Sequence, residues 1–467
     1  MKRFLLFLFV VAASAVVLWF GPLTSQESRD LGAAVLRFDQ RLRGAENGHG
    51  GDALTTRIKV LEVAGIPDEL ADREIDLAAQ FPARLKLETM IDGNAYRIGR
   101  DGETIWISVP HQKLAIEGAN DVPRFASDPD SVQPVQLPDF RNPIPRWQLA
   151  LIPAVFRVEP EVREKRQYRV RPRSFLAKLI GLPEDLVLGL EITDQGGLGE
   201  LAATTGDKRL RLAFESFGWV RKADVDGLSW ELSVADGQKP ERVALSHLEK
   251  FAGVLIDNLN AKIPTLPPVD GSRRVVASHG KGRLEMINGT RVLFLEGTPE
   301  EMGEQHGRLL KDEIRNLVDR IVYGVGVGSS FDKGRWFFGE IEEAQGRLEP
   351  FIDERYLREM DAIAAATGMH PQEVRLANFF PELFHCSGFA LHGSATVDGE
   401  LYHGRILDYL RGLGLEQNAV VMIMQPDEGN AWVNVSYAGF IGSVTAMNEK
   451  HVAMGEMGGR GEGNWDG

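Results

Sequence analysis

Hydrophobic and polar residues alternate along several segments in the first half of the chain. The segments RLKLETMI (84–91), AYRIG (95–99) and ETIWISV (103–109) alternate, and Asp-Gly pairs at 92–93 and 101–102 separate them. A period of two marks strands with one buried face, and Asp-Gly between two such segments is typical of tight hairpins. The pattern therefore predicts an antiparallel meander in this part of the chain.

Further segments extend the pattern towards the middle of the chain. Strands are expected over 186–193, 209–217 and 228–234, where alternation returns. The segment 241–263 instead repeats its apolar residues with the 3.6-residue period of a helix. We therefore predict an antiparallel β-rich domain with helices over residues 53–263.

A proline-rich linker at 264–274 is the predicted boundary between this domain and the rest of the chain. After an expected strand at 289–297, Thr298 is the candidate N-cap of a helix. Pro299 occupies the first turn of that helix, and Glu301 completes a capping box. The second region, residues 275–467, therefore opens with a strand followed by a helix.

The opening helix carries Gly303 and Gly307 one turn apart, which predicts close packing against a neighbouring element. A further helix is expected over 353–367 and ends at Gly368, and another begins near Pro371. Beyond these helices the pattern returns to strands. The second region is therefore predicted to be helical first and β-rich afterwards.

The composition narrows the possible functions. The chain has 467 residues, of which 43% are hydrophobic and 26% charged, as expected for a globular protein of two or three domains. Its net charge of -14 argues against a nucleic-acid partner, because phosphate binding needs a basic surface. Since no zinc-type spacing and no P-loop motif occurs, we expect neither a metal nor a cofactor.

Lys2 and Arg3 precede an uninterrupted apolar segment at residues 4–20. Its length lies between that of a signal-peptide core and that of a membrane span. Residues 1–22 are therefore predicted to be either a cleaved signal peptide or a retained membrane anchor. In both cases the remainder is exported, either periplasmic or extracellular or anchored to the membrane and facing outward.

Cys386 is the single cysteine of the chain, so it forms no intrachain disulfide. A lone cysteine is usually an inert core residue. This one lies where the helical pattern ends and the strand pattern begins, and Arg405 follows it 19 residues later (405 minus 386). A nearby guanidinium favours the thiolate form. Cys386 is therefore a candidate nucleophile, with an inert core residue as the alternative.

The segment CSGFALHGSATVDGELYHGRILDY resembles the nucleophile strand pair of N-terminal nucleophile (Ntn) hydrolases. It is most similar to the acyl-coenzyme A:isopenicillin N acyltransferase-like family. The matching positions are Cys386, the turn at 396–399, Arg405 and Asp408. The upstream segments EGTPEEMGEQHG and MDAIAAATGMHPQEVRLANFFPELFHC are similar to the opening helix and the helical lead-in of that family. The resemblance covers residues 290–467.

The resemblance implies a precursor that cuts itself between His385 and Cys386 into two chains that stay associated. The new terminal cysteine supplies the thiol nucleophile. Its α-amino group, with a pKa of roughly 7.7–8.0, supplies a base near neutral pH. His385 is either an assisting base or a residue of the connecting loop. The implied activity is hydrolysis of, or acyl transfer from, linear non-peptide amide bonds in a small-molecule amide or acyl substrate.

The family pattern makes Arg405 and Asp408 the catalytic partners of Cys386. We expect Arg405 to be a partly exposed strand-end residue that matters more for turnover than for folding. The alternative is an exposed arginine and an aspartate that ends its strand. His392 and His403 are expected on solvated strand faces.

The segment AMNEKHVAMGEMGG resembles a hairpin of the family, which makes Asn448 the candidate oxyanion donor. A turn asparagine, with a backbone N–H as donor, is the alternative. The predicted fold is α+β, in which a helical lead-in and the start of an αββα Ntn-hydrolase sandwich follow the β domain. Only 82 residues run from 386 to 467 (467 minus 386, plus one), so the region is expected to be truncated at its C-terminus.

Two other functions stay open. The meander MIDGNAYRIGRDGETIWISVP resembles the lipoprotein-carrier fold, which holds acyl chains. This resemblance implies a non-catalytic acyl- or lipid-binding exported protein. The other alternative is a phospholipase B-like hydrolase, which shares the Ntn fold and the cysteine but cleaves esters.

Overall fold

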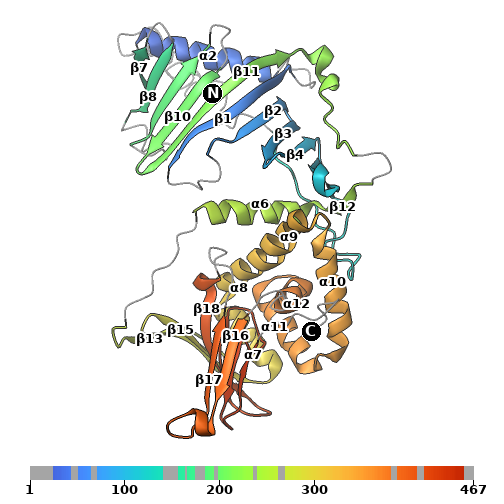
Figure 1. The fold of residues 1–467 in the computed structure, drawn as a ribbon, viewed down its shortest axis with the longest axis vertical. Coiled ribbons are helices and arrows are strands. Elements are labelled where there is room, and N and C mark those ends of the chain that lie inside the picture. The colour runs from blue at the N-terminus through green and yellow to red at the C-terminus, as the bar shows by residue number, and fades with distance from the viewer. Residues whose placement is uncertain are drawn as a thin grey trace, which may run out of the picture. The chain divides into compact units, whose positions relative to one another are not determined.

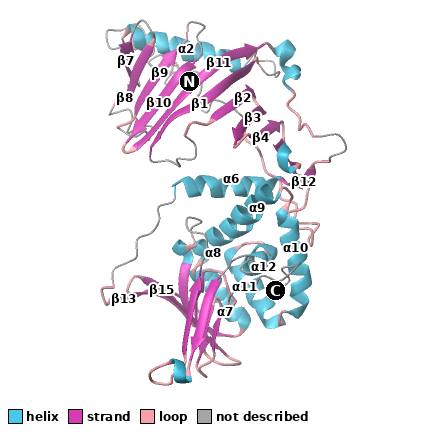
Figure 2. Cartoon of the chain, in the orientation of Figure 1, coloured by secondary structure: helices cyan, strands magenta, loops and turns pink. Residues whose placement is uncertain are grey.

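The computed structural model consists of two compact units (Figures 1 and 2). Unit 1 contains residues 1–119 and 135–242, and unit 2 contains residues 120–134 and 243–467. The structure describes residues 25–43, 51–64, 71–139, 156–162, 166–173, 185–193, 198–234, 239–260, 269–379, 386–407 and 415–456. Both units hold helices and strands, which confirms the mixed α+β fold class.

The unit boundary differs from the one expected from the proline-rich segment. Unit 1 ends at residue 242, so the helical part of 241–263 belongs to unit 2 and not to the predicted β domain at 53–263. Residues 120–134, which the sequence assigned to that domain, also belong to unit 2. Of the predicted linker at 264–274, residues 264–268 lie outside the described residues.

Unit 1 is built on one twelve-stranded sheet of order β12-β6-β5-β4-β3-β2-β1-β11-β10-β9-β8-β7. The strands are β1 (Ala53–Ala64), β2 (Glu74–Gln80), β3 (Arg84–Ile91), β4 (Asn94–Asp101), β5 (Thr104–Val109), β6 (Leu114–Ala119), β7 (Phe156–Val162), β8 (Gln167–Pro172), β9 (Val187–Ile192), β10 (Leu198–Thr205), β11 (Lys208–Val220) and β12 (Glu241–Ala244). The predicted meander and the strands expected near 186–193 and 209–217 are therefore confirmed.

The strand register separates the two faces of this sheet. Residues directly opposite each other share a face, so paired positions can be followed from strand to strand. One face is apolar and includes Ile116, Ile107, Ile98, Leu87, Leu77, Ile75, Ile58, Phe214, Leu212, Leu201, Leu190, Tyr168, Val170 and Val158. The other face carries cross-strand ion pairs such as Arg57–Asp76 and Arg97–Glu88. The alternation seen in the sequence thus becomes one continuous apolar surface.

Helix α2 (Gln26–Arg43) packs on the β7 end of the sheet. Leu31 is 6% exposed and lies in a cluster with Val158 and Val170. Further along the helix, the ring centroid of Phe38 lies 5.4 Å from that of Trp219. The helix therefore buries part of the apolar face against its own hydrophobic stripe.

The strand predicted at 228–234 is wrong. Residues 222–228 form a 3-10 helix, and no strand follows it within 229–234. Trp230 is 3% exposed, and its carbonyl accepts a hydrogen bond from Nε1 of Trp106 at 2.7 Å, while its own Nε1 donates to the carbonyl of Val225 at 3.1 Å. Burial of this indole and these side-chain bonds replace the expected strand pairing.

Unit 2 combines helices with a seven-stranded sheet and a separate hairpin (Figure 1). Its helices are α6 (Leu245–Asn260), α7 (Pro299–Leu309), α8 (Lys311–Val318), α9 (Gly326–Lys333), α10 (Phe337–Leu348), α11 (Glu354–Thr367) and α12 (Pro371–Phe379). The large sheet has the order β13 (Arg273–His279), β14 (Gly282–Ile287), β15 (Thr290–Gly297), β18 (Ala419–Pro426), β19 (Trp432–Tyr437), β20 (Thr445–Asn448) and β21 (Ala453–Gly455). The hairpin consists of β16 (Cys386–Leu391) and β17 (Tyr402–Leu407).

Helix α7 begins as its sequence predicts. The Thr298 side chain accepts from the Glu301 N–H, and the Glu301 carboxylate accepts from the Thr298 N–H, which completes the capping box. The close packing expected of Gly303 and Gly307 is also confirmed. A Cβ at Gly303 would lie 2.4 Å from the carbonyl oxygen of Glu359, and one at Gly307 would lie 2.6 Å from the Cβ of Ala366. Both glycines therefore let α7 approach α11.

Among the residues that the structure describes, no helix is long and apolar enough to span a membrane. The apolar segment at residues 4–20 lies outside the described residues, so the expected signal peptide or anchor stays a prediction.

Candidate active site

The candidate nucleophile lies at the start of strand β16. Helix α12 ends at Phe379 and β16 begins at Cys386, as expected for a cysteine at a change from helix to strand. In the ladder, Cys386 pairs with Leu407 and Gly388 pairs with Arg405. Positions 386, 388, 405 and 407 therefore share one face of the hairpin. Arg405 is thus one diagonal step from Cys386 along the ladder.

Arg405 is held by polar groups from the far end of the large sheet. Its Nη2 lies 2.7 Å from Oε2 of Glu456, and its Nε and Nη2 donate to the Glu456 carbonyl at 2.9 and 2.6 Å. Its Nη1 donates to Oγ1 of Thr445 at 3.3 Å. A charge-assisted cluster of this kind fixes the guanidinium in one orientation.

The expectation that Arg405 is partly exposed is wrong for its side chain, which is 2% exposed. The side chain lies over Gly455, where an added Cβ would stand 3.0 Å from the Arg405 Cγ. A strand-end position suggested exposure, but packing against β21 covers the side chain. Arg405 must therefore contribute to stability as well as to any chemistry.

The structure describes only some of the other residues that the sequence analysis considered. His385 and Asp408 lie outside the described residues, and β17 ends at Leu407. His392 and His403 are exposed, as expected.

Asn448 closes the turn after β20. Its Oδ1 accepts from the N–H groups of Lys450 and Val452, each at 3.0 Å. The asparagine therefore uses its side-chain oxygen to shape its own turn, and its role as an oxyanion donor stays a prediction.

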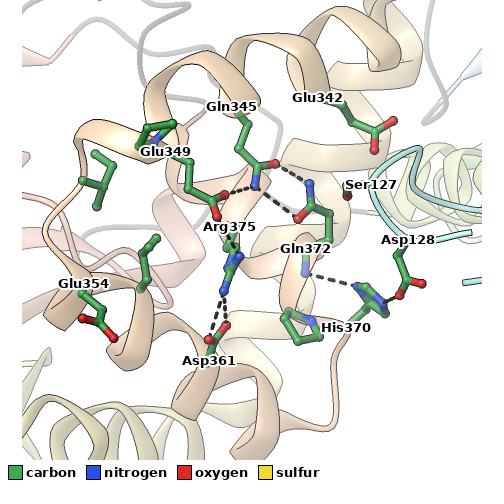
Figure 3. A pocket seen from close by; sticks show the side chains of 15 residues that line it. Ser127, Asp128, Glu342, Gln345, Glu349, Glu354, Asp361, His370, Gln372 and Arg375 are labelled. Atoms are coloured by element: carbon green, nitrogen blue, oxygen red, sulfur yellow. Dashed lines mark hydrogen bonds and ion pairs between the residues drawn. The ribbon is translucent and has the colours of Figure 1, made fainter.

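A pocket of about 830 Å³ lies elsewhere in unit 2, among α10, α11, α12 and the segment 120–134 (Figure 3). Its charged lining residues are Asp128, Glu342, Glu349, Glu354, Asp361, His370 and Arg375. Burial raises the pKa of Glu342 to about 7, although the N–H of Ala126 donates to its carboxylate at 2.9 Å. Among the described residues, the lining includes none of those that the sequence selected for catalysis.

Several polar groups of this pocket pair with one another. Nδ1 of His370 accepts from the N–H of Gln372 at 3.2 Å, and Nε2 lies 2.9 Å from Oδ2 of Asp128. The guanidinium of Arg375 bridges Glu349 at 3.0 Å and Asp361 at 2.9 Å. Both ring nitrogens of His370 have partners, so the imidazole links Asp128 of the segment 120–134 to the first turn of α12.

A second buried network lies next to this pocket, where Arg124 contacts Glu373 and the hydroxyl of Tyr323 donates to Glu373 at 2.6 Å. The ammonium of Lys250 lies 3.3 Å from the same carboxylate. Burial alone would raise the pKa of Glu373, but Lys250 and Arg124 outweigh it, so the pKa is lowered. Burial, and then the nearby Glu373 charge, raises the pKa of Tyr323 well above its usual value.

No protein-family model matches the chain. An uncharacterized protein of Archaeoglobus fulgidus is 27% identical over 200 residues, which cover 37% of this chain and 33% of that protein. Protein dcd1B of Dictyostelium discoideum is 25% identical over 204 residues, covering 38% of this chain and 40% of that protein. Protein dcd1A of the same organism is 28% identical over 195 residues, covering 35% and 43%. The chain therefore spans less than half of the length of each of these relatives.

Glu456 and Thr445 are the site residues that sequence reasoning missed. Neither stands at a fixed spacing from Cys386, and 51 residues separate Glu456 from Arg405. The one signal in the sequence was the segment AMNEKHVAMGEMGG, in which Glu456 follows a short strand-like stretch. Only side-chain packing between the hairpin and the far end of the large sheet shows that this carboxylate meets Arg405.

Proposed function

We propose that this protein is an N-terminal cysteine hydrolase or acyltransferase that acts on linear amide bonds. It activates itself by cutting the chain between His385 and Cys386. The observation that carries the proposal is the buried, fully oriented Arg405 one ladder step from Cys386 on the same face of the hairpin.

In the proposed self-cleavage, Sγ of Cys386 adds to the carbonyl carbon of residue 385. The C–N bond breaks, its nitrogen takes a proton, and a thioester remains. Water then cleaves the thioester, which gives a carboxylate at residue 385 and a free thiol beside a new α-amino group. In each later turnover the amine accepts the thiol proton, the thiol attacks the substrate amide, and the amine protonates the leaving nitrogen.

Arg405 has two roles in this scheme. A cation near the sulfur favours the thiolate, and an oriented guanidinium can hold a carbonyl or anionic group of the substrate. The negative charge of Glu456 partly offsets the positive charge of Arg405. The electric field of Arg405 at Cys386 is therefore weaker than that of an isolated arginine. The pair therefore favours precise orientation over a large shift in the pKa of the thiol.

The proposed fold is the αββα Ntn sandwich, to which the hairpin and the large sheet of unit 2 would contribute. The outer face of the hairpin leaves apolar side chains exposed, with Phe389 at 56%, Tyr402 at 51% and Ile406 at 59%. A sandwich buries such a face against a second layer. This exposed face supports the proposal because isolated sheets rarely present several large apolar side chains to water.

The test is the mass of the full-length chain before and after incubation, with N-terminal sequencing of the smaller product. We expect that product to begin Cys-Ser-Gly-Phe, and we expect a Cys386→Ala chain to stay intact. A wild-type chain that stays as intact as the Cys386→Ala chain overturns the proposal. A panel of matched amides and esters then separates an amidase from a phospholipase B-like esterase.

Export is part of this proposal. It rests on Lys2 and Arg3 ahead of the apolar residues 4–20. A reporter that is active only outside the cytoplasm, fused after residue 30, should be active. Signal from a reporter that works only in the cytoplasm would contradict export.

A second candidate function, acyl-chain binding by unit 1, is favoured by the continuous apolar face of its sheet. Ile98 on this face is 46% exposed, and Leu77, Leu87 and Ile58 are only partly buried. A fluorescent fatty acid should then bind the full chain, and Ile98→Asp should weaken that binding. The control Arg97→Asp alters the opposite, charged face of the same strand.

A further inference from the structure

The segment 120–134 forms a tight turn that docks on the helices of unit 2 through Phe125. The Phe125 side chain is fully buried, and its ring centroid lies 4.7 Å from that of His370, just before α12. The segment also closes on itself, because the N–H of Arg124 donates to the carbonyl of Ser131 at 3.2 Å and the N–H of Phe125 donates to the Ser131 hydroxyl at 3.1 Å. Phe125 is therefore presented to the helices by a turn that its own backbone stabilises.

Two pairs of an acid and a base hold the segment on the α12 side. Arg124 contacts Glu373, and Oδ2 of Asp128 lies 2.9 Å from Nε2 of His370. The other titratable groups around Arg124 are Tyr323, Lys250 and His247. On this side, each acid that contacts the segment or belongs to it therefore has a basic partner.

Glu342 contacts the same segment from α10 without a basic partner. Its Oε1 accepts from the N–H of Ala126 at 2.9 Å, and it lies at the same end of the pocket as Ser127 and Asp128 (Figure 3). Among the described residues, no lysine, arginine or histidine forms an ion pair with Glu342. Burial outweighs the Ala126 hydrogen bond and raises the pKa of this carboxyl to about 7. The docked segment therefore tolerates the ionised form of Glu342 poorly.

The other charged groups of the pocket do not compensate an ionised Glu342. These groups are Asp128 from the segment, His370 and Arg375 at α12, Glu349 after α10, and Glu354 and Asp361 on α11. The guanidinium of Arg375 is shared by Glu349 at 3.0 Å and Asp361 at 2.9 Å, and His370 pairs with Asp128. Both bases that line the pocket are therefore occupied by other acids.

We infer that Glu342 is a proton-controlled latch for the segment 120–134, such that its protonation keeps the segment docked and its ionisation favours release. This inference goes beyond the proposed function and does not depend on it. Because Ser127 and Asp128 line the pocket, release of the segment removes one part of the pocket wall.

The direction of the pH effect follows from proton binding. When the segment opens, water solvates the carboxylate, and the pKa of Glu342 returns towards its usual value of 4.5. The docked state therefore binds more protons than the open state between pH 4.5 and pH 7. The contribution of Glu342 to docking is fully present below pH 4.5, is lost as the pH rises through 7, and is constant above that.

The experiment measures hydrogen exchange of the full chain by mass between pH 5 and pH 8, corrected for the intrinsic pH dependence of exchange. Peptides from 120–134 report opening of the segment, and peptides from α7 report opening elsewhere in unit 2. Wild type is compared with Glu342→Gln, which keeps a hydrogen-bond acceptor but cannot ionise, and with Glu354→Gln. Glu354 is an exposed carboxylate that lines the same pocket. All other titrating groups are common to these chains, so ratios between chains isolate the substituted carboxyl.

Opening of the segment in wild type, relative to Glu342→Gln, should increase by about tenfold or more between pH 5 and pH 7 and level off above pH 7. Glu342→Met, which also lacks an ionisable group, should give the same pH dependence as Glu342→Gln. The ratio of wild type to Glu354→Gln, and all ratios in α7, should stay within about twofold across this range. A ratio of wild type to Glu342→Gln that does not change with pH, or that changes equally in α7, overturns the inference.

Discussion

Two buried arginines of unit 2, Arg124 and Arg405, lie in different parts of its fold. Arg124 lies within the helical part, where it contacts Glu373 and Tyr323 in a network that also includes Lys250. Arg405 joins a hairpin to the far end of a sheet and meets one carboxylate, one hydroxyl and one carbonyl. Burial and ion pairing are common to both sites. What distinguishes them is that only Arg405 shares a strand face with the single cysteine.

The contrast separates the strongly perturbed pKa values of unit 2 from the proposed site at Cys386 and Arg405. Two large shifts in unit 2 belong to groups around Arg124, namely Tyr323 and His247, where burial dominates. Arg124, Tyr323 and Glu373 bind one another, and the His247 ring packs against Tyr323. The role proposed for Arg405 rests instead on its place in the strand ladder relative to Cys386.

The largest expected effect is on stability at Arg124. Arg124→Met should lower the local free energy of opening by about 3 kcal/mol, because a buried carboxylate loses one of its partners. Hydrogen exchange of α12 measures this effect. Arg335→Met, which removes an exposed pair with Glu340, should change it by roughly 0–1 kcal/mol. Equal changes in the free energy of opening in the two variants would contradict a stabilising role of the buried network.

At Arg405 the principal effect should be on reaction rate. Arg405→Ala should slow self-cleavage on the order of a hundredfold, beyond what its unfolded fraction explains, because the oriented cation beside Cys386 is lost. Arg405→Lys should cleave faster than Arg405→Ala but more slowly than wild type, because lysine keeps the positive charge and lacks the planar guanidinium. Rates are compared at a temperature where circular dichroism shows each variant to be folded. Unchanged cleavage in Arg405→Ala would leave Arg405 a purely structural residue.

The pH dependence of stability should reveal His247. Burial, and then the nearby Arg124 charge, lowers its pKa to about 3, whereas an unfolded histidine titrates near 6.5. The folded state therefore binds fewer protons between these values, and stability falls as the pH falls through that window by up to about 1.4 kcal/mol per pH unit.

Replacing this ring tests the assignment. His247→Phe should flatten the decline between pH 6.5 and 3 in urea unfolding, while His306, with a pKa of about 4, keeps part of it. A His247→Phe slope identical to that of wild type would contradict a buried neutral imidazole.

The smallest effect should come from the partner of Arg405. Glu456→Gln removes the negative charge that offsets the guanidinium, so the thiol of Cys386 should titrate at a lower pH. Arg405→Ala should shift the titration upward. Each shift should be about one pH unit or less, because the charges of the pair partly cancel. Alkylation rate against pH measures both, and shifts in the same direction would contradict the electrostatic role.

The local elements of this protein were largely predictable from its sequence. The capping box at Thr298 and Glu301, the glycines that let α7 approach α11, and the meander at 84–109 depend on neighbours within a few residues or on periodicity. The start of β16 at Cys386 was predictable for the same reason. Short-range sterics and hydrogen bonding decide these features, so one segment contains the required information.

Contacts between distant segments were decided only by the tertiary structure. The burial of Arg405 depends on Glu456, 51 residues away, and residues 120–134 join unit 2 through Arg124 and Glu373, which are 249 residues apart. The strand expected at 228–234 does not form, because burial of the Trp230 indole outweighs the local alternation of polar and apolar residues. Packing of this kind depends on which surfaces meet in the folded chain, so it cannot be predicted from the spacing of residues along the sequence.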